Sequence, residues 1–336
     1  MIESVFVFVL AIVLIGGVKR YGPAFGFVDT PNGRSSHRRS MPISAGIGIY
    51  LAAAAGVLLF DTGLVREHVL SLLAILLVFV VGVLDDHRDA SPRTKFVVIA
   101  VATLLMVFDG IEIQSLGTLF GLTITLGWLS LPFTLFAVVG YTNALNLIDG
   151  LDGLAASLSL IILAALFSVG YSYHDHLMMM LSGTFMAALA AFLLFNWHPA
   201  KIFMGDSGSL VLGFVISLLA VRATAYIHPV SVLFLVSLPV FDTLIVMIRR
   251  KASGCSIFTA DKTHIHHILF NFFEGDTKRT VIFLSIMQII YALTALEVTA
   301  ESSETVILML FVLNTIVLYL IFSEMLKRQR RMGKEY

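Results

Sequence analysis

Long apolar runs separated by short polar stretches recur along the whole chain. A helix crosses a bilayer with about 20 mostly apolar residues, and about eleven segments approach that length, the fourth being the shortest. A transmembrane barrel would instead show strands of about 10 residues with strict alternation. The pattern therefore predicts an all-α integral membrane bundle with the spans Ile2–Val18, Ile43–Phe60, His68–Leu84, Phe96–Phe108, Trp128–Leu147, Leu154–Tyr171, Leu177–Phe195, Leu210–Tyr226, Val230–Ile248, Val281–Leu296 and Thr305–Phe322.

Lysine and arginine fall unevenly on the loops between these segments. When successive loops are placed on alternate sides of the membrane, all of them except Arg66 and Arg222 lie on one side. Basic residues concentrate on the cytoplasmic side of membrane proteins. The N-terminus is therefore predicted to lie outside and the C-terminus in the cytoplasm. The first span carries Lys19 and Arg20 after its apolar run, so it is expected to remain a helix rather than to be a signal peptide.

One predicted outer loop differs from the others. Within Asp109–Gly127, apolar and polar residues alternate in Ile111–Gln114 and again in Leu122–Thr125, around a Gly-rich middle. This pattern is typical of a small β-hairpin. No internal repeat or low-complexity stretch is evident, so residues 1–336 are expected to form a single polytopic membrane domain.

The composition excludes several classes of protein. The chain is 58% hydrophobic and 13% charged, with 22 basic and 22 acidic residues. Soluble domains are roughly 25% charged, and disordered chains have low hydrophobicity. A net charge of zero also disfavours a basic nucleic-acid-binding protein, so no nucleic-acid partner is expected. Cys255 is the single cysteine, which excludes an intrachain disulfide.

Three acids follow the third predicted span. On a helix, Asp85 and Asp86 lie four and three residues before Asp89, so the three carboxylates share a face and repel one another. A cation relieves that repulsion, and clustered carboxylates suit Mg²⁺. The alternative is an ordinary solvated loop.

A second group of polar residues lies at the end of the fifth span. Asn146, Asp149 and Asp152 are spaced three apart and are expected to line one helical stripe, with Gly150 and Gly153 leaving room for a ligand. Acids in an apolar membrane stretch are costly and indicate function. Amides and carboxylates can also pair with the edge of a nucleobase. The alternative is a glycine pair that packs helices beside acids reaching to the surface.

Asp206 stands at the start of the eighth span, where the positive end of a helix dipole favours a carboxylate. The alternative role is a simple N-cap. Phe203, three residues earlier, could stack on a flat ring or simply be an aromatic residue of the membrane interface.

The longest inner loop ends with His264, His266 and His267, close to the bases Arg250 and Lys262. This grouping favours contact with phosphate, with a zinc site or incidental loop histidines as alternatives. Asp242 lies within a span about 10 Å from its inner end. It could reach the same pocket or pair with a neighbour.

Together these residues form a predicted inner-face patch of carboxylates, amides, histidines and bases within apolar walls. Such a patch suits a divalent metal and a diphosphate nucleotide from the cytosol, with a lipid entering from the bilayer. The Gly-x4-Gly-Lys-Ser/Thr pattern of ATP-hydrolysing proteins is absent from the sequence.

The motifs, and their order along the chain, resemble those of the polyprenyl-phosphate N-acetylhexosamine-1-phosphate transferases. The resemblance covers essentially the whole chain, including the first inner loop from Asp29 to His37. It is carried by Asp85-Asp86-x-x-Asp89, Asn146-Leu-Ile-Asp149-Gly-Leu-Asp152-Gly, Phe203-Met-Gly-Asp206-x-Gly-Ser and His264-Ile-His266-His267.

The resemblance implies a bacterial inner-membrane enzyme whose active site faces the cytoplasm. Such an enzyme moves a sugar 1-phosphate from a UDP-N-acetylhexosamine to undecaprenyl phosphate, with Mg²⁺, or Mn²⁺ in its place, and releases UMP. It implies a metal ligand at Asp206, an acidic pair at the lipid phosphate (Asp85 and Asp86), and a catalytic role for His264. It assigns nucleotide, phosphate and sugar contacts to Asn146, Asp149, Asp152, Phe203, Arg250, Lys95, His266 and His267. The resemblance does not decide the oligomeric state, for which a homodimer is one possibility.

Within the family, the His-Ile-His-His run is similar to the UDP-GlcNAc branch, which starts O-antigen, common antigen or teichoic acid linkage units. Ser115–Gly121 also resembles the GlcNAc enzymes of enteric-type bacteria. The branch that uses UDP-MurNAc-pentapeptide has a Pro before three His, from which Thr263 and Ile265 depart. Two other departures, Ile43-Ser-Ala-Gly46 in place of a Gly-Gly pair and Ile257 in place of a Pro, leave the hexosamine open, a deoxy-HexNAc included.

The resemblance suggests a single in-line displacement, with a covalent aspartyl-phosphate route as the alternative. An ion-coupled transporter is the competing class of function, because intramembrane acids can relay protons. It predicts acids near the bilayer midplane and inverted repeats, whereas the acids here are predicted at inner span ends.

Overall fold

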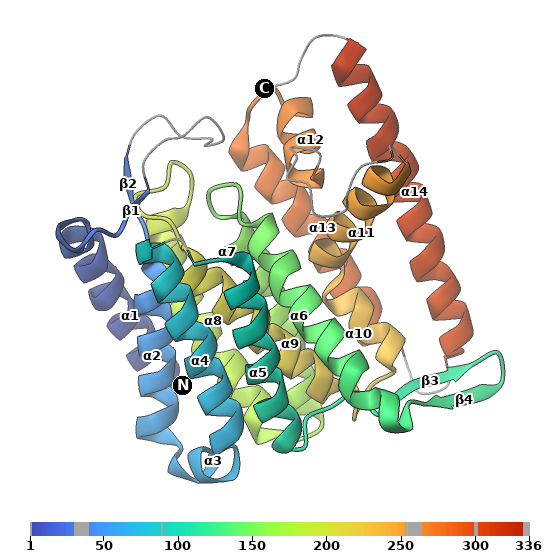
Figure 1. Cartoon of the computed structure of the whole chain (residues 1–336), viewed down its shortest axis with the longest axis horizontal. Helices are drawn as coiled ribbons and strands as arrows, with labels where there is room; N and C mark the ends of the chain where they lie inside the picture. Colours follow the sequence, from blue (N-terminus) through green and yellow to red (C-terminus); the bar gives the residue numbers. More distant parts are fainter. Residues whose placement is uncertain are drawn as a thin grey trace.

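The computed structural model describes residues 2–29, 40–88, 90–252, 254, 264–298 and 302–331. The predicted features at Asp89, in the first inner loop from residue 30 to His37, and at Cys255, Ile257, Lys262 and Thr263 lie outside these residues. The chain is a helical bundle (Figure 1) of α1 (Ile2–Tyr21), α2 (Ala45–Phe60), α3 (Thr62–Glu67), α4 (Val69–Arg88), α5 (Pro92–Phe108), α6 (Ser130–Ile148), α7 (Leu154–Ser172), α8 (His176–Asn196), α9 (Asp206–Ala223), α10 (Pro229–Leu235), α11 (Ser237–Ala252), α12 (Ile265–Phe272), α13 (Thr277–Glu297) and α14 (Glu304–Arg331). Short 3₁₀ turns lie at Gly22–Phe25 and Gly127–Leu129.

Every segment predicted to span the membrane is helical in the structure. Eight of the described helices are long and apolar enough to cross a membrane, or nine if α10 and α11 count as one span. Two predicted spans, α2 and α5, form shorter helices of 16 and 17 residues. The chain is thus an all-α polytopic membrane protein, in which each helix satisfies its own backbone hydrogen bonds as lipid requires.

The predicted span Val230–Ile248 is not continuous. α10 and α11 meet at an angle of 88°. Gln288 of α13 satisfies backbone groups at the break, because its side-chain amide donates to the carbonyl of Leu235 (2.8 Å) and accepts from the N–H of Leu238 (3.3 Å). This polar side chain, buried and distant in sequence, stabilises the break.

Helix α9 forms the axis of the bundle, and most of its residues are buried. α2, α4, α6 and α7 pack around it. Figure 1 shows α1, α2 and α4 on one side and α13 and α14 on the other. Glycines permit the close approach of these helices: a Cβ on Gly213 of α9 would lie 2.8 Å from the Cα of Thr142 on α6.

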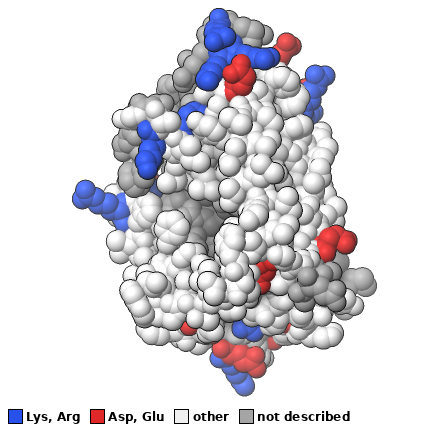
Figure 2. All heavy atoms as spheres, turned by 90° about the vertical axis from the view of Figure 1, so that its right-hand side faces the viewer, with Lys and Arg blue, Asp and Glu red and all other residues white. Residues whose placement is uncertain are grey.

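The surface matches a membrane setting. Most of the face in Figure 2 carries no Lys, Arg, Asp or Glu, and the basic side chains gather mainly toward its upper end. Leu and Ile side chains on α13 and α14 are exposed, as lipid-facing positions would be: Ile286, Ile290, Leu313, Ile316 and Leu320.

The predicted hairpin is present, as strands β3 (Ser115–Leu119) and β4 (Leu122–Thr125). Its tight turn places Phe120 and Gly121 at positive φ. The first strand begins later than the alternation suggests, because Ile111 and Ile113 are buried against the bundle. A second pair of very short strands, β1 (Val28–Asp29) and β2 (Met41–Pro42), flanks the first loop.

Candidate active site

Four charged groups meet where α4 and α5 join and α9 begins. The Nζ of Lys95 lies 2.7 Å from Oδ2 of Asp206 and 3.1 Å from Oδ2 of Asp85. Asp86 is the next residue of α4. The structure therefore brings together the acids after the third span, the acid at the start of the eighth and a lysine that joins them.

Asp86 is engaged by the start of α9. Its Oδ1 accepts from the backbone N–H of Asp206 (2.7 Å), and its Oδ2 accepts from the N–H of Ser207 (3.2 Å) and the hydroxyl of Ser44 (2.7 Å). A carboxylate at a helix N-terminus satisfies otherwise unpaired N–H groups and complements the dipole. Asp86 thus holds the first residues of α9, Asp206 and Ser207, in place.

Asp206 is not the N-cap of α9. Gly205 occupies that position, with a φ of 76°, and Asp206 is the first helical residue. Its carboxylate is directed to Lys95 instead. Gly205 is required here, because a Cβ would lie 2.5 Å from Oδ2 of Asp86.

Asn146, Asp149 and Asp152 do not line one helical stripe. α6 ends at Ile148 with Asp149 as its C-cap, and α7 begins after Gly153, its N-cap at positive φ, so both acids lie in the connection between the two helices. Asn146 remains on α6 and donates from Nδ2 to the hydroxyl of Ser209 on α9 (3.0 Å). This contact joins the second motif to the third.

Asp149 carries a perturbed carboxyl. Burial, followed by the nearby charges of Asp206, Asp86 and Asp152, raises the pKa of Asp149 to about 7. The carboxylates of this region thus outnumber the one ammonium of Lys95 that joins them. Such an excess of negative charge favours an added cation or a hydrogen-bond donor from a ligand.

Asp152 joins two loops. Its Oδ2 lies 2.7 Å from Nδ1 of His198 and accepts from the N–H of Ala200 (3.0 Å). Asn196 adds a second link, since its Oδ1 accepts from the N–H of Gly153 (2.8 Å) and its Nδ2 donates to the carbonyl of Ile202 (2.9 Å). The loop after α6 is thereby bound to the loop that leads to Phe203.

Replacing Asp152 with Ala should destabilise the chain, because it leaves the N–H of Ala200 and the ring of His198 without this acceptor. We expect the free energy of unfolding to fall by about 1–3 kcal/mol. Thermal unfolding of the purified protein measures this. Glu67→Ala, at an exposed site, is the control, and an equal unfolding midpoint for both variants would contradict the role of Asp152.

Phe203 is half-buried and its backbone is fixed on both sides. Its N–H donates to the carbonyl of Pro42 (2.9 Å), and its carbonyl accepts from the N–H of Ala45 (3.1 Å). The first loop and the start of α2 thus hold the motif. The sequence did not identify Ser44 as a site residue, although its hydroxyl donates to Asp86 and its backbone has a positive φ. The one feature that could have pointed to it is its place in the segment Ile43-Ser-Ala-Gly46.

The histidine run surrounds the start of α12. Nδ1 of His264 lies 2.7 Å from Oδ2 of Asp242, and the N–H of Ile265 donates to Oδ1 of Asp242 (2.5 Å). His266 is fully buried, and burial, followed by the charge of His267, lowers the pKa of His266 to about 3, so its ring is neutral. Asp242 therefore pairs with a neighbour, which is one of its two predicted roles.

The histidine run also contacts the second motif. A Cβ on Gly150 would lie 2.7 Å from Nε2 of His266, so the imidazole packs directly on the loop that carries Asp149. Arg250 lies in the last turn of α11 and is half-buried. Contacts therefore link the four motifs in turn: Lys95 joins the first to the third, Asn146 joins the second to the third, and His266 joins the fourth to the second.

The residues present fit a magnesium ion. Asp85 and Asp206 direct carboxylate oxygens at one ammonium group, a position that a small hard cation could share or take. Mg²⁺ is usually held by one or two carboxylates together with phosphates. Within the described ranges, no group of three or more His, Cys, Asp or Glu is placed to hold a metal, so phosphate oxygens and water would complete the shell.

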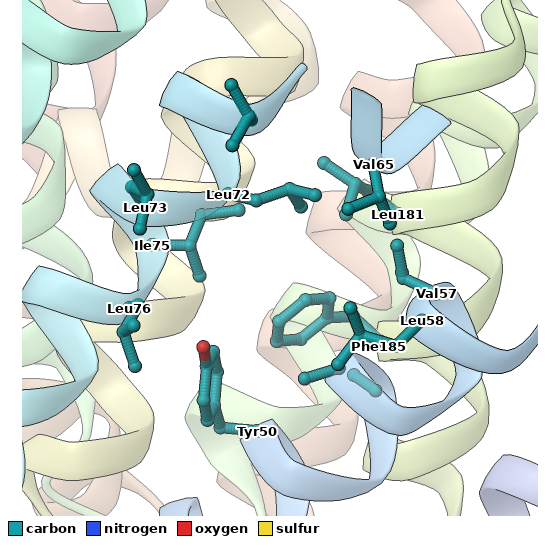
Figure 3. Close-up of a pocket in the computed structure, with 13 residues that line it drawn as sticks. Tyr50, Val57, Leu58, Val65, Leu72, Leu73, Ile75, Leu76, Leu181 and Phe185 are labelled. Atoms are coloured by element: carbon teal, nitrogen blue, oxygen red, sulfur yellow. The ribbon is translucent and has the colours of Figure 1, made fainter. Parts of the chain in front are cut away.

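An apolar pocket of about 230 Å³ lies apart from these charges, among α2, α3, α4 and α8. Figure 3 shows aliphatic side chains around it, with the hydroxyl of Tyr50 as the polar group among the labelled residues. Tyr50 stacks on Phe79 at 4.0 Å between ring centroids. The residues that line the pocket include no acid, base or histidine.

Residues 68–224 match the sequence profile of glycosyl transferase family 4. The chain is 35% identical to the probable undecaprenyl-phosphate N-acetylglucosaminyl 1-phosphate transferase of Bacillus subtilis (strain 168), over 90% of this chain and 85% of that protein. It is 30% identical to the undecaprenyl-phosphate alpha-N-acetylglucosaminyl 1-phosphate transferase of Yersinia pestis, over 99% and 93% of the two chains. The enzyme of that name from Escherichia coli (strain K12) is 30% identical over 93% and 88%.

Proposed function

The chain belongs to glycosyl transferase family 4, and from this premise we propose that it transfers GlcNAc 1-phosphate from UDP-GlcNAc to undecaprenyl phosphate and releases UMP. The proposal rests on the junction of α4, α5 and α9. There Lys95 lies between Asp85 and Asp206, at one end of an apolar helical bundle. This arrangement suits a reaction between two phosphorylated substrates, one of them a lipid.

The chemistry is a displacement at the β-phosphorus of the nucleotide sugar. An oxygen of the lipid phosphate forms a bond to this phosphorus, and the bond to the oxygen that bridges the two phosphates breaks, so that UMP leaves with the electron pair. Phosphoryl transfer of this kind depends mainly on positioning and charge stabilisation. The lipid phosphate is already largely dianionic at neutral pH, because its second pKa is near 6.

Each residue near Lys95 has a role in this scheme. Asp206, with Asp85, would hold Mg²⁺, which supplies positive charge to the diphosphate and the departing UMP when bound. Lys95 neutralises charge between the two substrates. Asp86 keeps the N–H groups of α9 in place and so orients Asp206.

The other motifs bind the nucleotide and sugar. Asn146 and Asp149 lie beside Asp206 and would pair with the uracil, against the ring of Phe203. Arg250, His264, His266 and His267 would contact the diphosphate and the sugar. Asp152 acts on this pocket through the loop that it binds.

Among the described residues, Arg88 lies in the last turn of α4, which also carries Asp85 and Asp86, and Arg249, Arg250 and Lys251 lie in the last turn of α11. Because basic residues concentrate on the cytoplasmic side, we propose that the site faces the cytoplasm at the bacterial inner membrane. The transporter alternative requires acids near the midplane. Asp85, Asp86 and Asp206 instead lie at helix ends.

Incubating the purified protein with undecaprenyl phosphate, Mg²⁺ and single UDP-sugars tests the function. We expect UMP and a lipid-diphosphate sugar with UDP-GlcNAc. Release of UMP with UDP-MurNAc-pentapeptide or a deoxy-HexNAc nucleotide alone would reassign the sugar. No UMP with any UDP-HexNAc would overturn the proposal.

Asp85→Asn should lower kcat by about 10–100-fold, and the loss should persist as the pH is raised from 7 to 9. The reason is that Asp85 holds Lys95 and the cation, whereas the dianionic nucleophile has no proton to lose. The measurement is UMP release across that pH range beside the wild type. A loss that disappears at high pH would show that Asp85 removes a proton instead.

A further inference from the structure

One buried carboxylate has no role in the scheme above. Asp242 is only 1% exposed and lies within α11. Both of its oxygens are used at the start of α12: Oδ2 faces Nδ1 of His264 at 2.7 Å and Oδ1 accepts from the N–H of Ile265 at 2.5 Å. Nδ1 of His266 lies farther off, at 3.9 Å.

These contacts set the orientation of His264. A ring nitrogen that faces a carboxylate carries the proton, so Nδ1 is the donor to Asp242 and Nε2 is the nitrogen that can meet a substrate. When both ring nitrogens carry a proton, His264 donates one N–H to Asp242 and the other to an oxygen of a phosphate, and the carboxylate of Asp242 balances the charge of the ring.

The pair lies next to the remaining site residues. His264 and His266 have ring centroids 5.6 Å apart, and His266 packs on Gly150 beside Asp149. Since the ring of His266 is neutral, it carries no positive charge to offer a diphosphate. His264, backed by a carboxylate, is the better donor.

We propose that Asp242 is a positioning residue of the transferase reaction, which orients His264 toward the diphosphate of the nucleotide sugar. The inference rests on the proposed function. Asp242 touches no substrate itself, and its effect passes through His264.

A double-mutant cycle on the full chain in lipid nanodiscs tests this. Asp242→Asn should lower kcat for UMP release by about 10–100-fold, the range found when a carboxylate that orients a metal-bound histidine is lost. The KM for undecaprenyl phosphate should stay within about twofold. Because Asp242 acts through His264, adding Asp242→Asn to His264→Gln should cost less than about a further twofold. Fully additive losses, or an unchanged kcat in Asp242→Asn, would overturn the inference.

Asp175→Asn is the matched control. Asp175 is also a buried acid at a helix start, where it accepts from the N–H of Met178 and binds Arg222 and Tyr226. It lies at the far end of α9, about 25 Å from Asp206. We expect Asp175→Asn to lower the unfolding temperature without changing kcat; a kcat loss equal to that of Asp242→Asn would show a general effect of destabilisation.

Asp242→Glu keeps the charge and covers the case in which Asp242→Asn does not fold. We expect it to retain at least about tenfold more activity than Asp242→Ala, and equal activity in the two would contradict the role of the carboxylate. A wild type that releases no UMP would refute the proposed function, whereas an active wild type with an unimpaired Asp242→Asn refutes only this inference.

Discussion

Asp206→Asn is expected to lower kcat by about 10³-fold or more. The change removes a charge that binds Lys95 and, in the proposed reaction, the metal at the diphosphate. Charge stabilisation of this kind contributes several kcal/mol to the transition state, and about 4 kcal/mol corresponds to 10³-fold. UMP release from UDP-GlcNAc at saturating lipid measures the effect.

A second readout ties this loss to the metal. The Mg²⁺ concentration that gives half-maximal activity should rise in Asp206→Asn, because one carboxylate ligand is lost. Asp109→Asn serves as the control: Asp109 is a buried carboxylate paired with His68 and Ser71, remote from Lys95. If Asp206→Asn had reduced activity but a normal Mg²⁺ requirement, Asp206 would act by pairing with Lys95 and not by binding the metal.

The apolar pattern predicts the positions of the helices well, because lipid admits only helices and closed barrels, and the long unbroken apolar runs do not fit barrel strands. It does not predict the break between α10 and α11. The break falls just before Pro239, which has no N–H to donate to the carbonyl of Leu235. Gln288, about fifty residues further along the chain, donates to that carbonyl instead. An apolar segment gives no sign of a partner so far away.

The site residues likewise divide into those that the local sequence identifies and those whose contacts depend on distant segments. The spacing of acids within each motif identifies Asp85, Asp149 and Asp206 as unusual, because charge is costly in an apolar chain. Spacing within one segment cannot show that Lys95 joins two motifs or that Asp86 binds the start of α9. It also predicts a helical stripe through Asp152, whereas α6 ends at Ile148 and Gly153, at positive φ, is the N-cap of α7.

Close contacts between helices explain why the site residues keep these positions. Gly46 of α2 and Gly82 of α4 both touch the first turn of α9: a Cβ on Gly82 would lie 2.6 Å from the carbonyl of Asp206. The N–H of Gly46 also donates to the carbonyl of Met204 (3.0 Å). α9 thus begins between two glycines, and its first residue is Asp206.

Gly46→Ala is therefore expected to impair folding and activity together. Its Cβ would lie 2.0 Å from the backbone nitrogen of Gly208, and a backbone atom cannot turn aside as a side chain can. Overpacking of this kind costs about 1–3 kcal/mol, and any relief moves α9 with Asp206. Thermal unfolding and kcat of the folded fraction measure both effects. Gly140→Ala in α6, where no heavy atom lies within 4 Å of the added Cβ, should leave both unchanged. If Gly46→Ala matched that control, the packing of α2 on α9 would not be what positions Asp206.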